Sequence, residues 1–194
     1  MNEKIITLLT DFLARNSEKE YRPGSDDYEI LRYGLAVIYY TITKTILLLA
    51  VAVALNILPY TLAFMAVFGG LRMYARGLHL KSNFGCTVLG FANYMVGIYI
   101  SIHFDIGLLL TVIIYLICVS LNAIYAPSPT ENSPISESEK LPLKFKTIII
   151  MGGLFIVMLV IGNNAYRNII LMATVIETLH ILPITYKIFK EKRN

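Results

Sequence analysis

The sequence contains little charge, and this shortage narrows the class of protein. Of its 194 residues only 15% are charged, whereas 56% are hydrophobic, and the mean hydropathy is +0.64. A soluble domain usually carries about 25% charged residues, so this chain is too apolar for that class. It is also long enough for several membrane spans. The sequence therefore predicts an all-α fold, a polytopic bundle of membrane helices.

Cysteine is also scarce, with one residue at Cys86 and one at Cys118. Two cysteines give neither a disulfide framework nor a zinc pattern, so we expect no structural metal and no cofactor. Cys118 lies in an uncharged stretch, where a thiol acts as a small packing residue. The chain lacks the basic and aromatic pattern of nucleic-acid binding, so we expect no nucleic-acid partner. It also lacks a signal-peptide pattern, so we expect no cleaved leader.

Apolar stretches divide the chain into about six candidate spans, at residues 30–58, 61–71, 86–103, 106–125, 147–162 and 169–186. Crossing a hydrocarbon core takes about 20 helical residues. The second stretch is interrupted by Arg72 before it reaches this length, so we expect it to be short, tilted or re-entrant. Residues 2–15 predict a short helix, either at the membrane surface or packed in the ordinary way. Residues 126–146 predict an exposed, mobile loop.

The order of these segments predicts three parts: a cytoplasmic or interfacial segment 1–29, a transmembrane domain 30–186 and a basic cytoplasmic tail 187–194. If all six segments cross the bilayer, every lysine and arginine except Lys44 and Arg167 falls on the same side. The positive-inside rule assigns that side to the cytoplasm. We therefore expect a multi-pass protein of the cell membrane.

Reactive side chains gather between two of the apolar segments, in residues 71–86. A cysteine is a nucleophile as its thiolate, and an imidazole is its usual proton acceptor, so His79 and Cys86 are a candidate catalytic pair. On one continuous helix they would be about 10.5 Å apart along the axis. Because Gly77 and Gly85 tolerate bent backbone, we predict that the helix breaks and that the pair approaches within about 4 Å.

Basic side chains accompany the pair. Arg72, Arg76 and Lys81 make the stretch electropositive, which favours a thiolate over a thiol. Cys86 is also expected to begin the third span, where the helix dipole stabilises negative charge. Backbone N–H groups of residues 85–87 are candidate oxyanion donors. By pattern alone such a pair is more often incidental in a membrane protein. The catalytic hypothesis therefore depends on the basic residues and the helix start that surround the pair.

The run Arg72-x-x-x-Arg76-Gly77-x-His79, followed by Cys86, resembles the Arg-x-x-x-Gly-Gly-x-His…Cys signature of the AgrB family of membrane cysteine endopeptidases. Arg76 stands where the family usually has the first glycine of its pair. The similarity extends to the order of the apolar segments and to two short motifs, Tyr125-Ala-Pro127 and Asn132-Ser-Pro-Ile135.

The resemblance implies an activity and a substrate. Cys86 would be the nucleophile and His79 the general base and then the general acid, so that an acyl thioester divides peptide cleavage into two easier steps. The family substrate is a small AgrD-like propeptide that lies on the membrane through an amphipathic helix. The acyl group then passes to a cysteine of the same propeptide and closes a thiolactone for quorum sensing. The implied partners are this propeptide, the lipid bilayer and, in a homodimer, a second copy. The residues expected to support the site are Arg72, Arg76, Gly77, Lys81 and Gly85.

A membrane transporter or binding protein without covalent chemistry is the alternative. Lys44, Glu177 and His180 fall inside expected spans, which is a common mark of translocation pathways. Glu177 and His180 also resemble half of a carboxylate-bridged metal site, but a second such pair is missing. Hydrogen bonding between helices, or pairing with Lys44, is the simpler interpretation.

Overall fold

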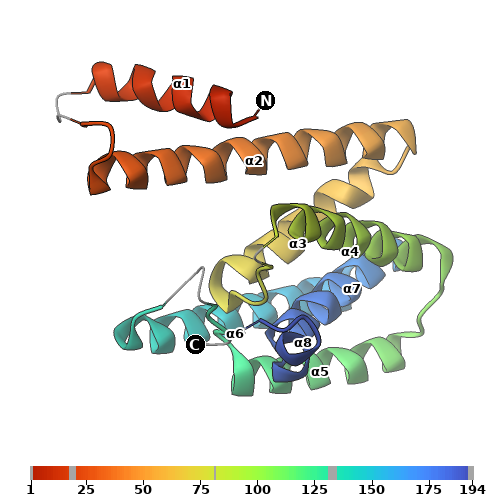
Figure 1. Cartoon of the computed structure of the whole chain (residues 1–194). Helices are drawn as coiled ribbons and strands as arrows, with labels where there is room; N and C mark the ends of the chain where they lie inside the picture. The colour runs from red at the N-terminus through yellow and green to blue at the C-terminus, as the bar shows by residue number, and fades with distance from the viewer. Residues whose placement is uncertain (1, 18–20, 81, 131–134, 192–194) are drawn as a thin grey trace. The chain divides into compact units, whose positions relative to one another are not determined.

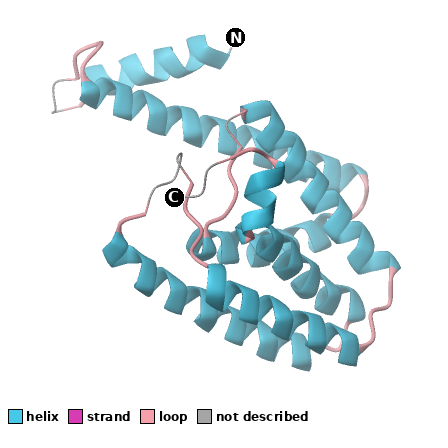
Figure 2. Cartoon of the chain, turned by 60° about the horizontal axis from the view of Figure 1, so that its bottom comes forward, coloured by secondary structure: helices cyan, strands magenta, loops and turns pink. Residues whose placement is uncertain are grey.

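The computed structural model describes residues 2–17, 21–80, 82–130 and 135–191. Within these ranges the regular secondary structure is helical, and loops join the helices (Figure 2). The helices are α1 (Asn2–Arg15), α2 (Asp26–Ala54), α3 (Leu58–Ala75), α4 (Asn83–His103), α5 (Leu108–Tyr125), α6 (Glu137–Val160), α7 (Asn164–Ile181) and α8 (Pro183–Ile188). The predicted all-α fold class is confirmed.

Four of the described helices, α2, α4, α5 and α6, are long and apolar enough to cross a membrane. Their large apolar side chains face outward, for example Leu109 and Val160, which are 77% and 76% exposed. Such surfaces suit lipid, so the chain has the character of a membrane protein. The expected count of about six spans is not confirmed, because α3 and α7, which carry ionisable side chains, are not among these four helices.

Several expected boundaries are wrong because local capping and tertiary contacts extend the helices. The second segment does not stop at Leu71, since α3 continues to Ala75. α2 begins at Asp26, where the Ser25 side chain accepts the hydrogen bond of a backbone N–H. Residues 137–146, expected in a loop, are helical because Ser136 opens a capping box for α6. Residues 126–130, expected to be exposed, are buried.

The chain divides into two compact units, residues 1–55 and 56–194. In the first unit α1 packs on α2, and Ile6 is buried. The Tyr28 hydroxyl donates a hydrogen bond of 2.6 Å to the Asp11 carboxylate, which ties the two helices together. The outward face of α1 carries Leu8 and Phe12, which are 69% and 63% exposed. The short helix expected over residues 2–15 is therefore present, with an apolar face exposed.

In the second unit α7 is the central helix (Figure 1). It contacts α3, α4, α5 and α6, and most of its residues from position 168 to its end are buried. Gly97 of α4 lies against Phe64 of α3 and Ile176 of α7, where even a methyl group would collide with the Phe64 ring. The absence of a side chain at Gly97 therefore lets three helices pack closely.

The Gly97→Ala substitution should destabilise the second unit by about 1–3 kcal/mol, because the added methyl group overpacks a closed contact. The matched control is Gly90→Ala, two turns earlier on α4, where nothing lies within 4 Å of an added Cβ. Thermal unfolding of the purified protein in detergent should show a lower midpoint for Gly97→Ala alone. Equal midpoints for the two variants would contradict the packing described here.

Candidate active site

The backbone turns sharply where α3 ends. Arg76 has a φ of 62° and Gly77 a φ of 120°, both in the left-handed region that favours glycine. α4 begins only at Asn83, so the predicted helix break between Arg76 and Cys86 is confirmed. A non-glycine residue in such a conformation costs about 1–3 kcal/mol. This cost gives a physical reason for a glycine at position 76 in the related signature.

Three backbone hydrogen bonds hold this turn against distant parts of the chain. The Gly77 N–H donates to the Ser128 carbonyl at 3.0 Å, and the Ser128 N–H donates to the Ala75 carbonyl at 3.0 Å. The Leu78 N–H donates to the His180 carbonyl at 2.9 Å. Gly77 and Leu78 are buried as a result. The loop after α5 and the end of α7 thus fix the path of the chain before His79.

His79 and Cys86 come together where the turn meets the start of α4. Sγ of Cys86 lies 3.8 Å from Nδ1 of His79, so the predicted approach within about 4 Å is confirmed. His79 is exposed and Cys86 is half-buried, which leaves the pair accessible. Cys86 lies at the N-terminal end of α4, although α4 begins three residues earlier than expected. The helix dipole there favours negative charge on the thiol sulfur.

The backbone N–H groups proposed as oxyanion donors are partly occupied. The Gly85 N–H donates to Oγ of Ser82 at 3.2 Å, and the Cys86 N–H donates to the Ser82 carbonyl at 2.9 Å. Both bonds belong to the cap of α4. The N–H groups of Gly85 and Cys86 are therefore used to cap the start of α4 in this structure, and neither is free to stabilise an oxyanion.

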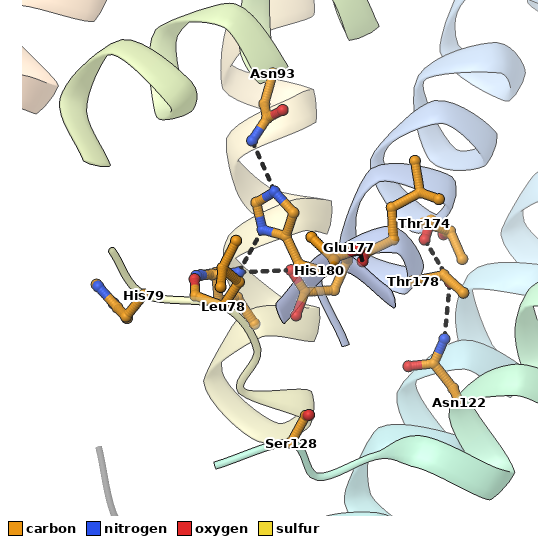
Figure 3. A network of polar contacts seen from close by, with 12 residues as sticks. Leu78, His79, Asn93, Asn122, Ser128, Thr174, Glu177, Thr178 and His180 are labelled. Atoms are coloured by element: carbon orange, nitrogen blue, oxygen red, sulfur yellow. Dashed lines mark hydrogen bonds and ion pairs between the residues drawn. The ribbon is translucent and has the colours of Figure 1, made fainter. Parts of the chain in front are cut away.

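A buried polar network lies behind the turn (Figure 3). Nη1 of Arg72 donates to Oε2 of Glu177 at 3.2 Å and to Nδ1 of His180 at 2.7 Å, while Nη2 donates to the Leu78 carbonyl. Glu177 and His180 are only 1% and 7% exposed. The side-chain amide of Asn93 lies 2.9 Å from Nε2 of His180. The interpretation of Glu177 and His180 as an interhelical hydrogen-bonding pair is confirmed, with Arg72 as their partner.

Sequence reasoning missed Asn93, since an asparagine within an apolar helix belongs to no motif. The sequence feature that could have identified it is its position within an expected span, because a polar side chain there usually has a hydrogen-bond partner. Among the residues predicted to support the site, Arg72 is in the network and Arg76 is exposed on the turn. Lys81 and residues 132–134 of the second short motif lie outside the described residues.

A hollow of about 310 Å³ opens beside His79. Aromatic and apolar walls come from Phe68, Met73 and Tyr94, and Arg72 and Arg76 add positive charge. Such a surface can receive a peptide segment next to the pair. Across the described ranges, no three His, Cys, Asp or Glu side chains gather as a metal site would require. The chemistry available here is that of a thiol next to an imidazole.

Comparisons with known proteins point to one family. The family model described as "Accessory gene regulator B" matches residues 6–181. The chain is 30% identical over 159 residues to an AgrB-like protein of Clostridium acetobutylicum, covering 81% of this chain and 76% of that protein. It is 30% identical over 156 residues to accessory gene regulator protein B of Staphylococcus haemolyticus, covering 80% and 82%. The corresponding protein of Staphylococcus saprophyticus is 25% identical over 183 residues, covering 94% and 96%. No solved structure matches the chain.

The two residues of the turn should respond differently to substitution. Gly77→Ala should destabilise the protein by about 1–3 kcal/mol, because alanine rarely adopts this φ. Its Cβ would also lie 3.3 Å from both Arg72 and His180. Arg76→Gly should leave stability unchanged or raise it by about 1 kcal/mol, since relieved strain exceeds the added chain entropy. Thermal unfolding in detergent measures both, and a stable Gly77→Ala protein would contradict the turn geometry.

Proposed function

Because the chain belongs to the AgrB family of accessory gene regulator proteins, which act in quorum sensing, we propose that it is a membrane-embedded cysteine endopeptidase. The observation that carries the proposal is the distance of 3.8 Å between Sγ of Cys86 and Nδ1 of His79. A thiol and an imidazole this close can exchange a proton after a small adjustment, as is common in sites without substrate.

In the proposed reaction His79 takes the proton of Cys86, and the thiolate attacks the carbonyl carbon of the scissile peptide bond. The protonated imidazole then gives its proton to the leaving amine, and the peptide bond breaks. The N-terminal part of the substrate remains on Cys86 as an acyl thioester. A cysteine thiol of the same peptide next attacks this thioester, its proton passes through His79, and the Cys86 thiol is restored. The product is a thiolactone ring.

The proposed substrate is a small AgrD-like propeptide that lies on the membrane surface. The hollow beside His79 supports this choice, because its apolar walls and its two arginines suit a peptide segment that is partly apolar and partly acidic. The proposed partners are therefore the propeptide and the lipid bilayer, together with a second copy of the chain in a homodimer.

We place the pair on the cytoplasmic side of the cell membrane. Basic residues of distant segments gather at the end of the second unit that holds the pair: Lys140 and Lys144 line a hollow with residues 124–127, and Nζ of Lys146 lies 5.7 Å from the centre of the Tyr74 ring. At the other end of α7, Arg167 is 3.8 Å from Asp105. This asymmetry supports the cytoplasmic assignment through the positive-inside rule.

The first test replaces the nucleophile. Cys86→Ala in lipid vesicles should abolish both cleavage of an AgrD-like propeptide and the acyl adduct, measured by mass spectrometry. Cys86→Ser should also be nearly inactive, because a hydroxyl is a much weaker nucleophile than a thiolate. Cys118→Ala is the matched control and should retain both signals, since Cys118 is buried in a separate apolar cluster.

Cleavage by the Cys86→Ala protein at the wild-type rate would refute the proposed nucleophile. Movement of intact propeptide across the vesicle membrane, without cleavage by the wild-type protein, would favour the transport alternative instead. That alternative has lost part of its support, because Glu177 and His180 are engaged with Arg72 rather than lining an open path.

The second test removes the proton carrier. His79→Ala should slow both formation and breakdown of the acyl-enzyme by roughly 100- to 10,000-fold, the usual cost of losing general acid–base catalysis. The protein should remain folded, because the His79 side chain is exposed. Single-turnover kinetics in vesicles measures both steps, and the His103→Ala variant is the control for loss of an exposed histidine. An unchanged rate in His79→Ala would exclude its assigned role.

A further inference from the structure

Residues of three helices form the network that holds the guanidinium of Arg72, which belongs to α3. Glu177 and His180 approach it from α7, and Asn93 of α4 stands behind His180 (Figure 3). On its other side the guanidinium donates to the carbonyl of Leu78, which is the residue just before His79. The planar fork of an arginine fixes all of its N–H directions together. Holding Arg72 from α7 therefore also fixes the Leu78 carbonyl.

The protons of this network can be assigned from its donors and acceptors. A guanidinium only donates, so Nδ1 of His180 accepts from Arg72. The single proton of the neutral ring is then on Nε2, which lies 2.9 Å from Nδ2 of the Asn93 amide. Because an amide N–H₂ group cannot accept, the bond from Nε2 requires the Asn93 amide to be turned over so that its oxygen takes this position. Asn93 thus favours the His180 tautomer whose Nδ1 can accept a hydrogen bond from the guanidinium.

The carboxylate of Glu177 adds the charge that balances Arg72. Its Oε2 atom takes the guanidinium bond, while Oε1 is buried without a hydrogen-bond partner among the described residues. Removing the single partner of a buried carboxylate leaves a buried charge unpaired, which is energetically costly, and the same holds for the partner when the carboxylate is removed. Removing the charge at Glu177 should therefore loosen Arg72 more than the loss of an ordinary neutral hydrogen bond would.

We propose that Glu177, His180 and Asn93 are positioning residues of the site. They orient Arg72, Arg72 holds the Leu78 carbonyl, and this bond aims the next residue, His79, at Cys86. In Figure 3 His79 points away from the network, so the three residues act through the backbone and not by touching the pair. The effect on catalysis rests on the proposed function, whereas the effect on geometry does not.

The geometric test needs no peptidase activity. In a Cys118→Ala, His79→Cys background, positions 79 and 86 both carry thiols, and phenylarsine oxide bridges two thiols only when they are adjacent. Adding Glu177→Gln, which keeps the size but removes the charge, should slow bridging at least tenfold. The matched control is Thr178→Val, the next residue on α7, whose hydroxyl bonds instead to Asn122 at 2.8 Å and to the Thr174 carbonyl at 2.7 Å.

Thr178→Val should leave the bridging rate within about twofold of the background, because its hydroxyl contacts Asn122 and Thr174, on the side of the network away from Leu78 and His79 (Figure 3). Equal bridging in Glu177→Gln and the background would overturn the proposal, and so would equal slowing by Thr178→Val. If Glu177→Gln does not fold, Asn93→Ala decides, because Asn93 is half-buried and its loss spares the ion pair. It should slow bridging about threefold, and an unchanged rate would overturn the proposal.

The catalytic test uses the wild-type residues at positions 79 and 86. Glu177→Gln should lower kcat for propeptide cleavage by about 10- to 100-fold, since misplacing a catalytic group by about 1 Å costs rates of this order. KM should stay within about threefold, because the residues that line the hollow remain. Unchanged kcat would overturn the positioning role. Absence of cleavage in the wild-type protein would refute the proposed function instead, and the bridging experiment would still decide the geometry.

Discussion

The pairing of Arg72 with Glu177 is the interaction on which the geometry of the site depends. Both charges lie in apolar helices, where an unpaired charge would be expensive. Once paired, Arg72 stays on α3, and the helix continues through the position at which the hydropathy pattern alone would end it. The remaining guanidinium N–H groups can then bind His180 and the Leu78 carbonyl. A residue that interrupts the apolar pattern therefore organises the turn that follows it.

The turn itself shows what the sequence can predict and what it cannot. The helix break was predictable because a helical spacing of seven residues is too long for proton transfer and because Gly77 permits a positive φ. The partners of the turn were not predictable, because Ser128 and His180 lie more than 50 and 100 positions away and reach it only after folding. The burial of residues 126–130 follows from the same contacts. Their proline and serine content predicts an exposed loop. The prediction is correct for the backbone conformation, but it is wrong for the exposure of these residues.

Arg76 illustrates a conflict between local and tertiary preferences. Its positive φ disfavours a side chain, yet the residue is held there by its neighbours, since Ala75 and Gly77 are both bonded to Ser128. The exposed Arg76 side chain lines the hollow beside His79. The strain of about 1–3 kcal/mol is thus offset by the bonds around it, and the position gains a cation that glycine would lack.

His79 and Cys86 come from different elements, so their approach depends on two separate supports. Cys86 is fixed by the start of α4, and α4 is fixed where Gly97 packs against Phe64 and Ile176. His79 is fixed by the turn, which the His180 carbonyl holds through the Leu78 N–H. Ile176 and His180 both belong to α7, one turn apart. α7 supplies no atom to the reacting pair, yet both supports rest on it. α7, which is not among the four helices apolar enough to cross a membrane, is therefore the element that sets the distance between the thiol and the imidazole.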